Sequence, residues 1–91
     1  MLYLVCFDIS DNKTRNRVGK YLETFGNRVQ ESVFEVELAD AGALNYVQNK
    51  LAGWLADGDD LRFYCLCRSC RLKSYTARQE RIAKLPSLVL L

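Results

Sequence analysis

The sequence contains no histidine, one proline and five glycines among its 91 residues. Without histidine, neither a Ser-His nor a Cys-His nucleophilic site can be built. The isolated glycines form no phosphate-binding loop, and the composition excludes collagen-like and low-complexity chains. The longest apolar run, Leu2 to Phe7, is far shorter than the ~20 residues of a membrane span, and no basic segment precedes it as in a secretory signal. We therefore expect a soluble, cytoplasmic protein without a membrane partner.

The composition is that of one globular domain, with 49% apolar and 26% charged residues. The net charge of +2 is unevenly distributed along the chain. Residues 1–60 carry 6 Lys and Arg against 10 Asp and Glu, whereas residues 61–91 carry 7 against 1. A basic segment attracts polyanions, so nucleic acid or another acidic surface is one interpretation of the final third. A solvated, solubilising surface is the other.

The hydrophobic pattern alternates between the two-residue period of strands and the wider period of helices. Strands are predicted over residues 2–7, 28–38 and 61–67, with two shorter ones over 72–76 and 87–91. A tight bend near Glu31 and Ser32 would divide the second strand into a hairpin, because eleven residues are long for one strand. Residues 77–85 are interpreted as a loop or a short helix.

Two amphipathic helices are predicted between these strands. The first begins at Ser10 to Asn12, which offer N-cap chemistry, and ends at Gly26. The second is capped by Asp40 and ends at Gly58. Their apolar stripes are Val18, Tyr21, Leu22 and Phe25 in the first, and Leu44, Val47, Leu51, Trp54 and Leu55 in the second. Two helices on one face of a small sheet form an α+β sandwich.

The strands over 2–7 and 61–67 are apolar on both faces, but two helices can cover one face of the sheet. A second copy of the chain is the simplest cover for the other face. We therefore expect a homodimer packed through the sheet face. Residues 1–91 form a single domain in this interpretation, with 73–91 a C-terminal extension that packs on the partner.

The four cysteines allow three interpretations. Cys65, Cys67 and Cys70, joined by Cys6 from a neighbouring strand, could supply four thiolates to zinc. A disulfide is the second interpretation, although a cytoplasmic protein disfavours it. Buried, unmodified thiols are the third, because Cys6 and Cys65 lie in apolar strands.

Asp8 directly follows the first strand, so its carboxylate is expected at the edge of the sheet. A turn-forming or capping aspartate is the structural alternative. One carboxylate supplies too few oxygens for Mg²⁺, but two Asp8 side chains near a dimer axis could hold one Mg²⁺, or Mn²⁺, that keeps several waters. Such an ion would polarise a phosphodiester and lower the pKa of a bound water, which allows hydrolysis without histidine.

Four basic residues follow on the first predicted helix, namely Lys13, Arg15, Arg17 and Lys20. They are interpreted either as a solvated helix face or as contacts to a phosphate backbone. No base-reading pattern is present, so sequence-specific recognition is not indicated. The five tyrosines and Trp54 could stack on bases, but most are expected in the core.

Three segments resemble the signatures of the Cas-two family of CRISPR-associated nucleases. They are Leu4 to Asp11 with Arg15, Arg17 and Val18, then Gly26 to Glu35, then Arg62 to Tyr64 followed by Cys67-x-x-Cys70. Together they cover residues 2–72. Phe7 stands where the family usually has a tyrosine before its metal-binding aspartate, and this leaves the carboxylate intact. The last twenty residues match the family only in character.

The resemblance implies a ferredoxin-like βαββαβ fold with an extra C-terminal strand, in a homodimer with its sheets face to face. It implies that Asp8 is the catalytic Mg²⁺ ligand of an endonuclease that cleaves single-stranded RNA or double-stranded DNA. It also implies a role in CRISPR adaptation, in which the dimer bridges copies of the integrase and holds protospacer DNA through basic residues. The candidates for that contact are Lys13, Arg15, Arg17, Lys20 and Arg28. Two alternatives stay open: a non-catalytic DNA-binding scaffold between integrase dimers, and a ferredoxin-like regulatory module that binds a small ligand.

Overall fold

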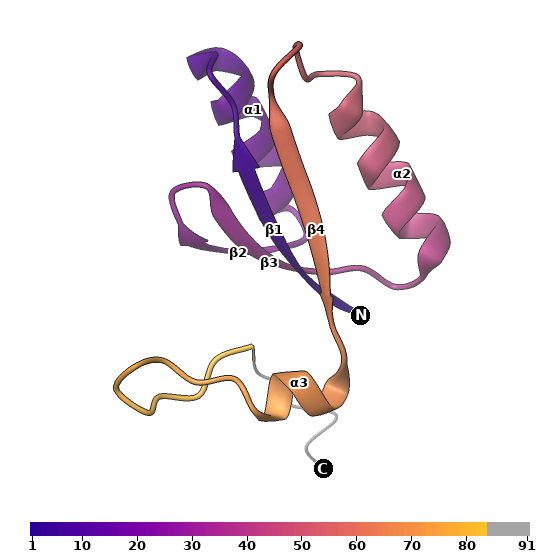
Figure 1. Cartoon of the computed structure of the whole chain (residues 1–91). Coiled ribbons are helices and arrows are strands. Elements are labelled where there is room, and N and C mark those ends of the chain that lie inside the picture. The colour runs from indigo at the N-terminus through magenta and orange to yellow at the C-terminus, as the bar shows by residue number, and fades with distance from the viewer. Residues whose placement is uncertain (84–91) are drawn as a thin grey trace.

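The computed structural model of the chain describes residues 1–83. They form a four-stranded antiparallel sheet with two long helices on one face (Figure 1). The elements are β1 (Leu2–Asp8), α1 (Asn12–Glu23), β2 (Gly26–Gln30), β3 (Val33–Glu37), α2 (Ala41–Ala52), β4 (Asp60–Leu66) and α3 (Arg68–Leu72). The spatial order is β2-β3-β1-β4, so β1 lies between β3 and β4. This is the predicted ferredoxin-like βαββαβ arrangement, and the hairpin bend lies at Glu31 and Ser32 as predicted.

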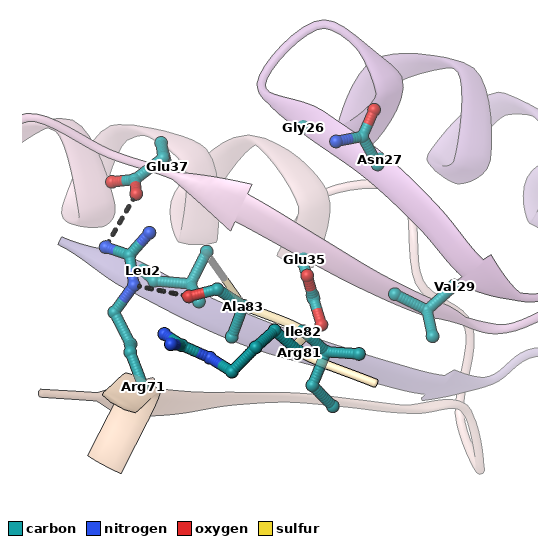
Figure 2. Close-up of a pocket in the computed structure, with 10 residues that line it drawn as sticks. All are labelled: Leu2, Gly26, Asn27, Val29, Glu35, Glu37, Arg71, Arg81, Ile82 and Ala83. Atoms are coloured by element: carbon teal, nitrogen blue, oxygen red, sulfur yellow. Dashed lines mark hydrogen bonds and ion pairs between the residues drawn. The ribbon is translucent and has the colours of Figure 1, made fainter. Parts of the chain in front are cut away.

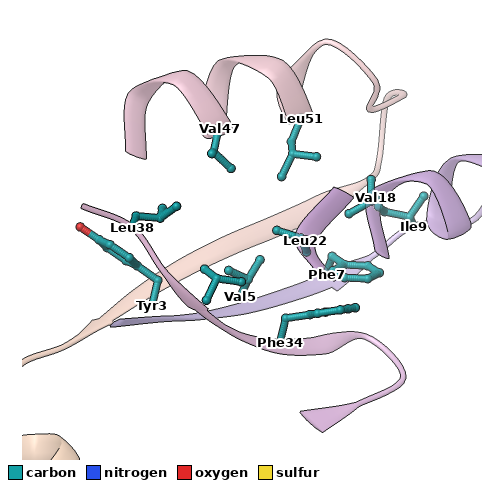
Figure 3. Close-up of a cluster of buried hydrophobic side chains, with 11 residues drawn as sticks. Tyr3, Val5, Phe7, Ile9, Val18, Leu22, Phe34, Leu38, Val47 and Leu51 are labelled. Atoms are coloured by element: carbon teal, nitrogen blue, oxygen red, sulfur yellow. The ribbon is translucent and has the colours of Figure 1, made fainter. Parts of the chain in front are cut away.

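The hydrophobic core lies between the sheet and the two long helices (Figure 3). Its buried residues are Tyr3, Val5, Phe7, Ile9, Val18, Leu22, Phe34, Val36, Leu38, Val47 and Leu51. The rings of Phe7 and Phe34 stack across β1 and β3, with centroids 5.9 Å apart. Burial of one such side chain stabilises the fold by about 1.5–3 kcal/mol. Because strand side chains alternate between faces, burial of Tyr3, Val5 and Phe7 turns Leu4, Cys6 and Asp8 to the opposite face.

Each long helix begins at an aspartate cap. The sequence predicted Asp40 for the second helix and the segment Ser10 to Asn12, which contains Asp11, for the first. Asp11 Oδ2 accepts a hydrogen bond from the Thr14 backbone N–H at 2.8 Å. Asp40 Oδ1 accepts one from the Ala43 N–H, also at 2.8 Å. These bonds satisfy backbone donors that a helix start leaves unpaired, which explains why the helices begin there.

The two glycines predicted to end the helices have other roles. Helix α1 ends at Glu23 and α2 at Ala52, so both predicted ends were wrong. Gly26 is the first residue of β2, where a Cβ atom would overlap the Glu35 carbonyl oxygen of β3. Gly58 adopts a positive φ of 88° in the turn before β4. In the sequence, a glycine that permits close strand pairing cannot be distinguished from a glycine that caps a helix, because each follows the apolar stripe of a helix.

The segment after β4 differs most from the prediction. Residues 68–72 form α3, and Tyr75 makes an isolated bridge with Arg81, so the strand predicted over 72–76 is wrong. The chain then returns to the sheet, where the Arg71 guanidinium contacts Glu37 and Ala83 (Figure 2). The predicted strand over 87–91 lies outside the described residues. Packing of 73–91 on a partner stays a prediction.

Among residues 1–83, no helix is both long enough and apolar enough to cross a lipid bilayer.

Candidate active site

The sheet face opposite α1 and α2 carries the candidate site. We call it the open sheet face and define it by the register partners Leu4, Cys6, Asp8, Glu35, Asp60, Arg62 and Tyr64. Leu4 is half-buried and lies between Glu35 on β3 and Tyr64 on β4. Residues that oppose each other in antiparallel strands share a face, so this surface combines apolar and charged side chains.

Asp8 is the last residue of β1, and its side chain is exposed. The β1–β4 register pairs Asp8 with Asp60 and Cys6 with Arg62. Two carboxylates therefore stand at the same end of the open sheet face, on adjacent strands. A shallow hollow of about 310 Å³ lies there, lined by Cys6, Phe7, Asp8, Asp60, Arg62 and Tyr64.

Arg62 balances one of the two carboxylates. Its Nε lies 2.9 Å from Asp60 Oδ2, and its Nη1 reaches the Tyr64 hydroxyl at 3.5 Å. The hydrogen bond to Tyr64, together with the charge of Asp60 and the bond to it, raises the pKa of the Arg62 guanidinium. Arg62 thus stays charged beside the hollow, where it can attract an anion.

The Asp8 carboxylate is exposed and has no charged partner among the described residues. Within residues 1–83, it takes part in no hydrogen bond or ion pair. Carboxylate oxygens are the ligands that Mg²⁺ and Mn²⁺ prefer. In the same range, however, no group of three or more His, Cys, Asp or Glu side chains is placed to hold a metal. Within residues 1–83, one chain thus offers fewer protein oxygens at this place than Mg²⁺ takes in total.

The loop between β1 and α1 is held in place by contacts from both sides. Arg15 Nη1 donates to the Ile9 carbonyl at 2.8 Å, and Arg15 Nη2 donates to Asn12 Oδ1. From the β4 side, Asp59 Oδ1 accepts a hydrogen bond from the Ser10 N–H at 3.4 Å. Arg15 therefore positions the loop that follows Asp8.

The other basic candidates do not gather around Asp8. Lys13 and Lys20 are exposed on α1. The Arg17 guanidinium lies 3.9 Å from the centre of the Trp54 ring, a cation–π contact. Arg28 lies over the Phe34 ring at 4.7 Å, with Nη2 3.4 Å from Glu23 Oε1. Of the five basic candidates, Arg15 is the one with a contact to the loop beside Asp8.

The sequence interpretation missed Asp60 and Tyr64 as neighbours of Asp8. Alternation along β4 indicates that residues 60, 62 and 64 share a face, but not which residue of β1 each one opposes. The expectation that most of the five tyrosines and Trp54 lie in the core was also wrong, because three of these six are exposed. Tyr46, Tyr64 and Tyr75 are 63%, 48% and 49% exposed, respectively.

The cysteines are free thiols, and they are more accessible than expected. Cys6 is half-buried, whereas Cys65, Cys67 and Cys70 are exposed. The expectation that Cys65 is buried was therefore wrong for the described chain. It lies near the end of β4, opposite Tyr3 of β1.

Comparisons with known proteins agree with the family resemblance of the three sequence segments between residues 4 and 70. The model of the family described as CRISPR associated protein Cas2 matches residues 1–74. The chain is 45% identical over 73 residues to CRISPR-associated endoribonuclease Cas2 1 of Chloroflexus aurantiacus, an alignment that covers 78% of this chain and 77% of the relative. It is 38% identical over 68 residues to CRISPR-associated endoribonuclease Cas2 4 of Rhodospirillum rubrum, covering 75% of this chain and 55% of that relative.

Solved structures share the fold along most of the chain. A chain of a partial Cas6-RT-Cas1–Cas2 complex superposes with a TM-score of 0.84 at 32% identity, and 93% of both chains is covered. Streptococcus pyogenes Cas2 superposes with a TM-score of 0.73 at 28% identity, covering 84% of this chain and 98% of that one. The chain therefore belongs to the Cas2 family of CRISPR-associated proteins.

Proposed function

We propose that two copies of this chain form a metal-dependent endonuclease that cleaves single-stranded RNA or double-stranded DNA during CRISPR spacer acquisition. The observation that carries the proposal is the exposed Asp8 carboxylate, which no other group engages within the described residues. The names of the relatives, which are endoribonucleases, support nuclease activity. The similar chain solved in a complex with Cas1 supports a partnership with the CRISPR integrase.

In this proposal, the Asp8 carboxylates of the two copies would together hold one Mg²⁺ or Mn²⁺ ion. When bound, the ion supplies Lewis-acid polarisation of the phosphodiester and lowers the pKa of a water. Arg62 neutralises Asp60 through their 2.9 Å contact, which limits the negative charge that a phosphate meets there. Arg15 fixes the Ile9 carbonyl and thereby the loop that orients Asp8.

The remaining basic residues are proposed to contact the nucleic-acid backbone. Lys13 and Lys20 are exposed, so their ammonium groups can reach phosphates. Arg17 and Arg28 are oriented by aromatic rings, which lowers the entropy that each side chain loses when it binds a phosphate. Contacts of this kind fix the register of a nucleic acid without reading its sequence.

A non-catalytic scaffold is the second candidate function. It is favoured by the donor count, because the described part of one chain offers fewer than three metal-ligating groups in any one place. A scaffold would use the basic residues and the integrase contact but not the Asp8 carboxylate.

The Asp8→Asn variant separates the two candidate functions. We expect it to lose Mg²⁺-dependent cleavage of RNA or duplex DNA by about 100-fold or more, because the amide removes the charge that holds the cation. Its affinity for nucleic acid should stay within about twofold of wild type. Asp57→Asn is the matched control, since Asp57 is exposed and lies outside the hollow.

Cleavage should be measured with Mg²⁺ and with Mn²⁺, beside a spacer-integration assay with the integrase. Equal cleavage by wild type and Asp8→Asn would refute the catalytic role of Asp8. If wild type cleaves neither substrate with either ion and still supports integration, the scaffold is correct.

A further inference from the structure

Two thiols face each other where β4 joins α3. Cys67 is the residue immediately before α3, and Cys70 lies within that helix. Both side chains are exposed and carry no disulfide, and their Sγ atoms lie 3.3 Å apart. Helix α3 follows the end of β4 opposite to Asp60, so the pair is far from the hollow beside Asp8 (Figure 1). The proposed nuclease makes no use of it.

We propose that Cys67 and Cys70 form a reversible redox site, at which a small disulfide of the glutathione class oxidises the two thiols to an intrachain disulfide. A disulfide bond is about 2.05 Å long, so closure needs the sulfurs to approach by roughly 1.2 Å from their present separation. Small side-chain rotations at two exposed positions can provide this movement, since no packed core surrounds them.

The two thiols differ in acidity, which gives each a separate role. The Ser69 hydroxyl, 3.3 Å from Cys67 Sγ, and then the Cys70 backbone N–H lower the pKa of the Cys67 thiol to about 7. The hydrogen bond between the two thiols and then the negative charge of Cys67 raise the pKa of Cys70. Thiolates are the nucleophiles of disulfide exchange, so Cys67 attacks first and Cys70 resolves.

The exchange balances without any further reagent. Cys67 first gives its proton to solvent, and its thiolate attacks one sulfur of the oxidant, whose S–S bond breaks as a mixed disulfide forms and the first thiolate leaves. Cys70 then gives its proton to solvent and attacks Cys67 Sγ, which releases the second thiolate. The two cysteines lose two electrons in total, and the oxidant is reduced to two thiols that take up the two protons.

The surroundings favour a disulfide over a bound metal. A structural zinc site needs four ligands, usually thiolate or imidazole. The sequence contains no histidine, and residues 1–83 hold no cluster of three potential ligands around this pair. Two thiols close to each other, with one near-neutral pKa, match the requirements of disulfide exchange instead.

The test uses the full chain with Cys6→Ser and Cys65→Ser, which leaves the proposed pair as the only thiols. This variant is equilibrated with mixtures of reduced and oxidised glutathione. Mass spectrometry should then show a loss of two hydrogens, and neither thiol should react with an alkylating reagent. Dithiothreitol should restore them. Adding Cys67→Ser to this variant should abolish the loss of two hydrogens. Circular dichroism should confirm that each variant is folded.

The acidity difference gives an independent readout. At pH 7, alkylation of Cys67 in the Cys70→Ser variant should be about fivefold faster than alkylation of Cys70 in the Cys67→Ser variant. Three outcomes would each overturn the proposal. They are disulfides formed between chains, a stable glutathione adduct on Cys67 without ring closure, and zinc that protects both thiols from alkylation. None of these readouts measures nuclease activity, so the redox proposal can fail or hold independently of the proposed function.

Discussion

Arg71 is a residue whose importance the sequence does not reveal. Its side chain is 8% exposed, with Nη1 2.8 Å from Glu37 Oε1 and Nε 3.0 Å from the Ala83 carbonyl oxygen. Burial of a guanidinium is unfavourable unless its donors are paired, and here it is paired across α3, β3 and the returning segment. In sequence it is one of seven basic residues in the final third. Its role arises from contacts between residues that are distant in the chain.

We expect Arg71→Ala to destabilise the fold by about 2 kcal/mol, because it leaves the Ala83 carbonyl without this donor and removes one of the two cationic partners of Glu37, the other being the Met1 ammonium. Urea unfolding followed by circular dichroism measures the difference. Arg78→Ala is the control, since Arg78 is exposed on the loop, and its effect should stay within ±0.5 kcal/mol. Equal stability of Arg71→Ala and wild type would show that Arg71 does not fasten the segment.

Asp8 and Asp60 show how far residue-level prediction reaches. Asp8 was expected after the first strand, at the edge of the sheet, but it is the last residue of β1, which is a central strand. Asp60 and Tyr64 were missed as its neighbours, because the β1–β4 register depends on how two distant strands pair. The sequence therefore identifies single chemical groups more readily than it identifies which groups meet.

The secondary-structure elements were predicted best at their beginnings. The cap Asp40 was predicted correctly, and the cap Asp11 lies within the predicted segment Ser10 to Asn12, because an N-cap acts locally, through a donor three residues away. Helix α3 was missed, since five residues are too few to show a helical period. The helix ends were wrong where glycine served the sheet or a turn.

The cap of α1 predicts a pH dependence. The Thr14 backbone N–H, and then the Thr14 hydroxyl, hold the pKa of Asp11 below its ordinary value of 3.8. A carboxyl whose pKa is lower in the folded state stabilises the protein above the unfolded-state pKa, and this stabilisation disappears as pH falls through the folded-state pKa. Acidification below pH 3.8 should therefore weaken the start of α1.

Asp11→Ser isolates this effect, because a serine hydroxyl accepts the same hydrogen bond but does not titrate. The free energy of unfolding of wild type should fall relative to that of Asp11→Ser as pH drops below 3.8. Urea unfolding at a series of pH values measures both proteins, and the other carboxylates act as an internal control because the two chains share them. Parallel pH profiles for the two proteins would contradict the expected linkage.

At the scale of the whole molecule, the open sheet face decides whether the candidate site is complete. The described segment 81–83 returns to one end of this face, near Leu2, which is buried (Figure 2). Further along the face, Leu4 is half-buried and its register partner Tyr64 is exposed, and Asp8 is exposed at the other end. A face with apolar residues at its centre and carboxylates at one edge suits burial against a second copy, which would bring two Asp8 side chains together.

Leu4→Glu should therefore split the dimer and abolish metal-dependent cleavage together, because it places an uncompensated charge between the two sheets beside Glu35. Analytical ultracentrifugation measures the association, and we expect the dissociation constant to rise by at least about 100-fold. Tyr46→Ser is the control, since Tyr46 is 63% exposed on α2, behind the opposite sheet face, and should leave the dimer intact.

Asp8→Asn supplies the complementary measurement, because it should remove cleavage while the dimer persists. Together the two variants distinguish loss of the ligand from loss of the partner that completes the site. A wild-type chain that stays monomeric at micromolar concentration and still cleaves would show that one copy suffices. The pairing of Asp8 residues across an axis would then be wrong, and the cation would have to be held by groups of a single chain.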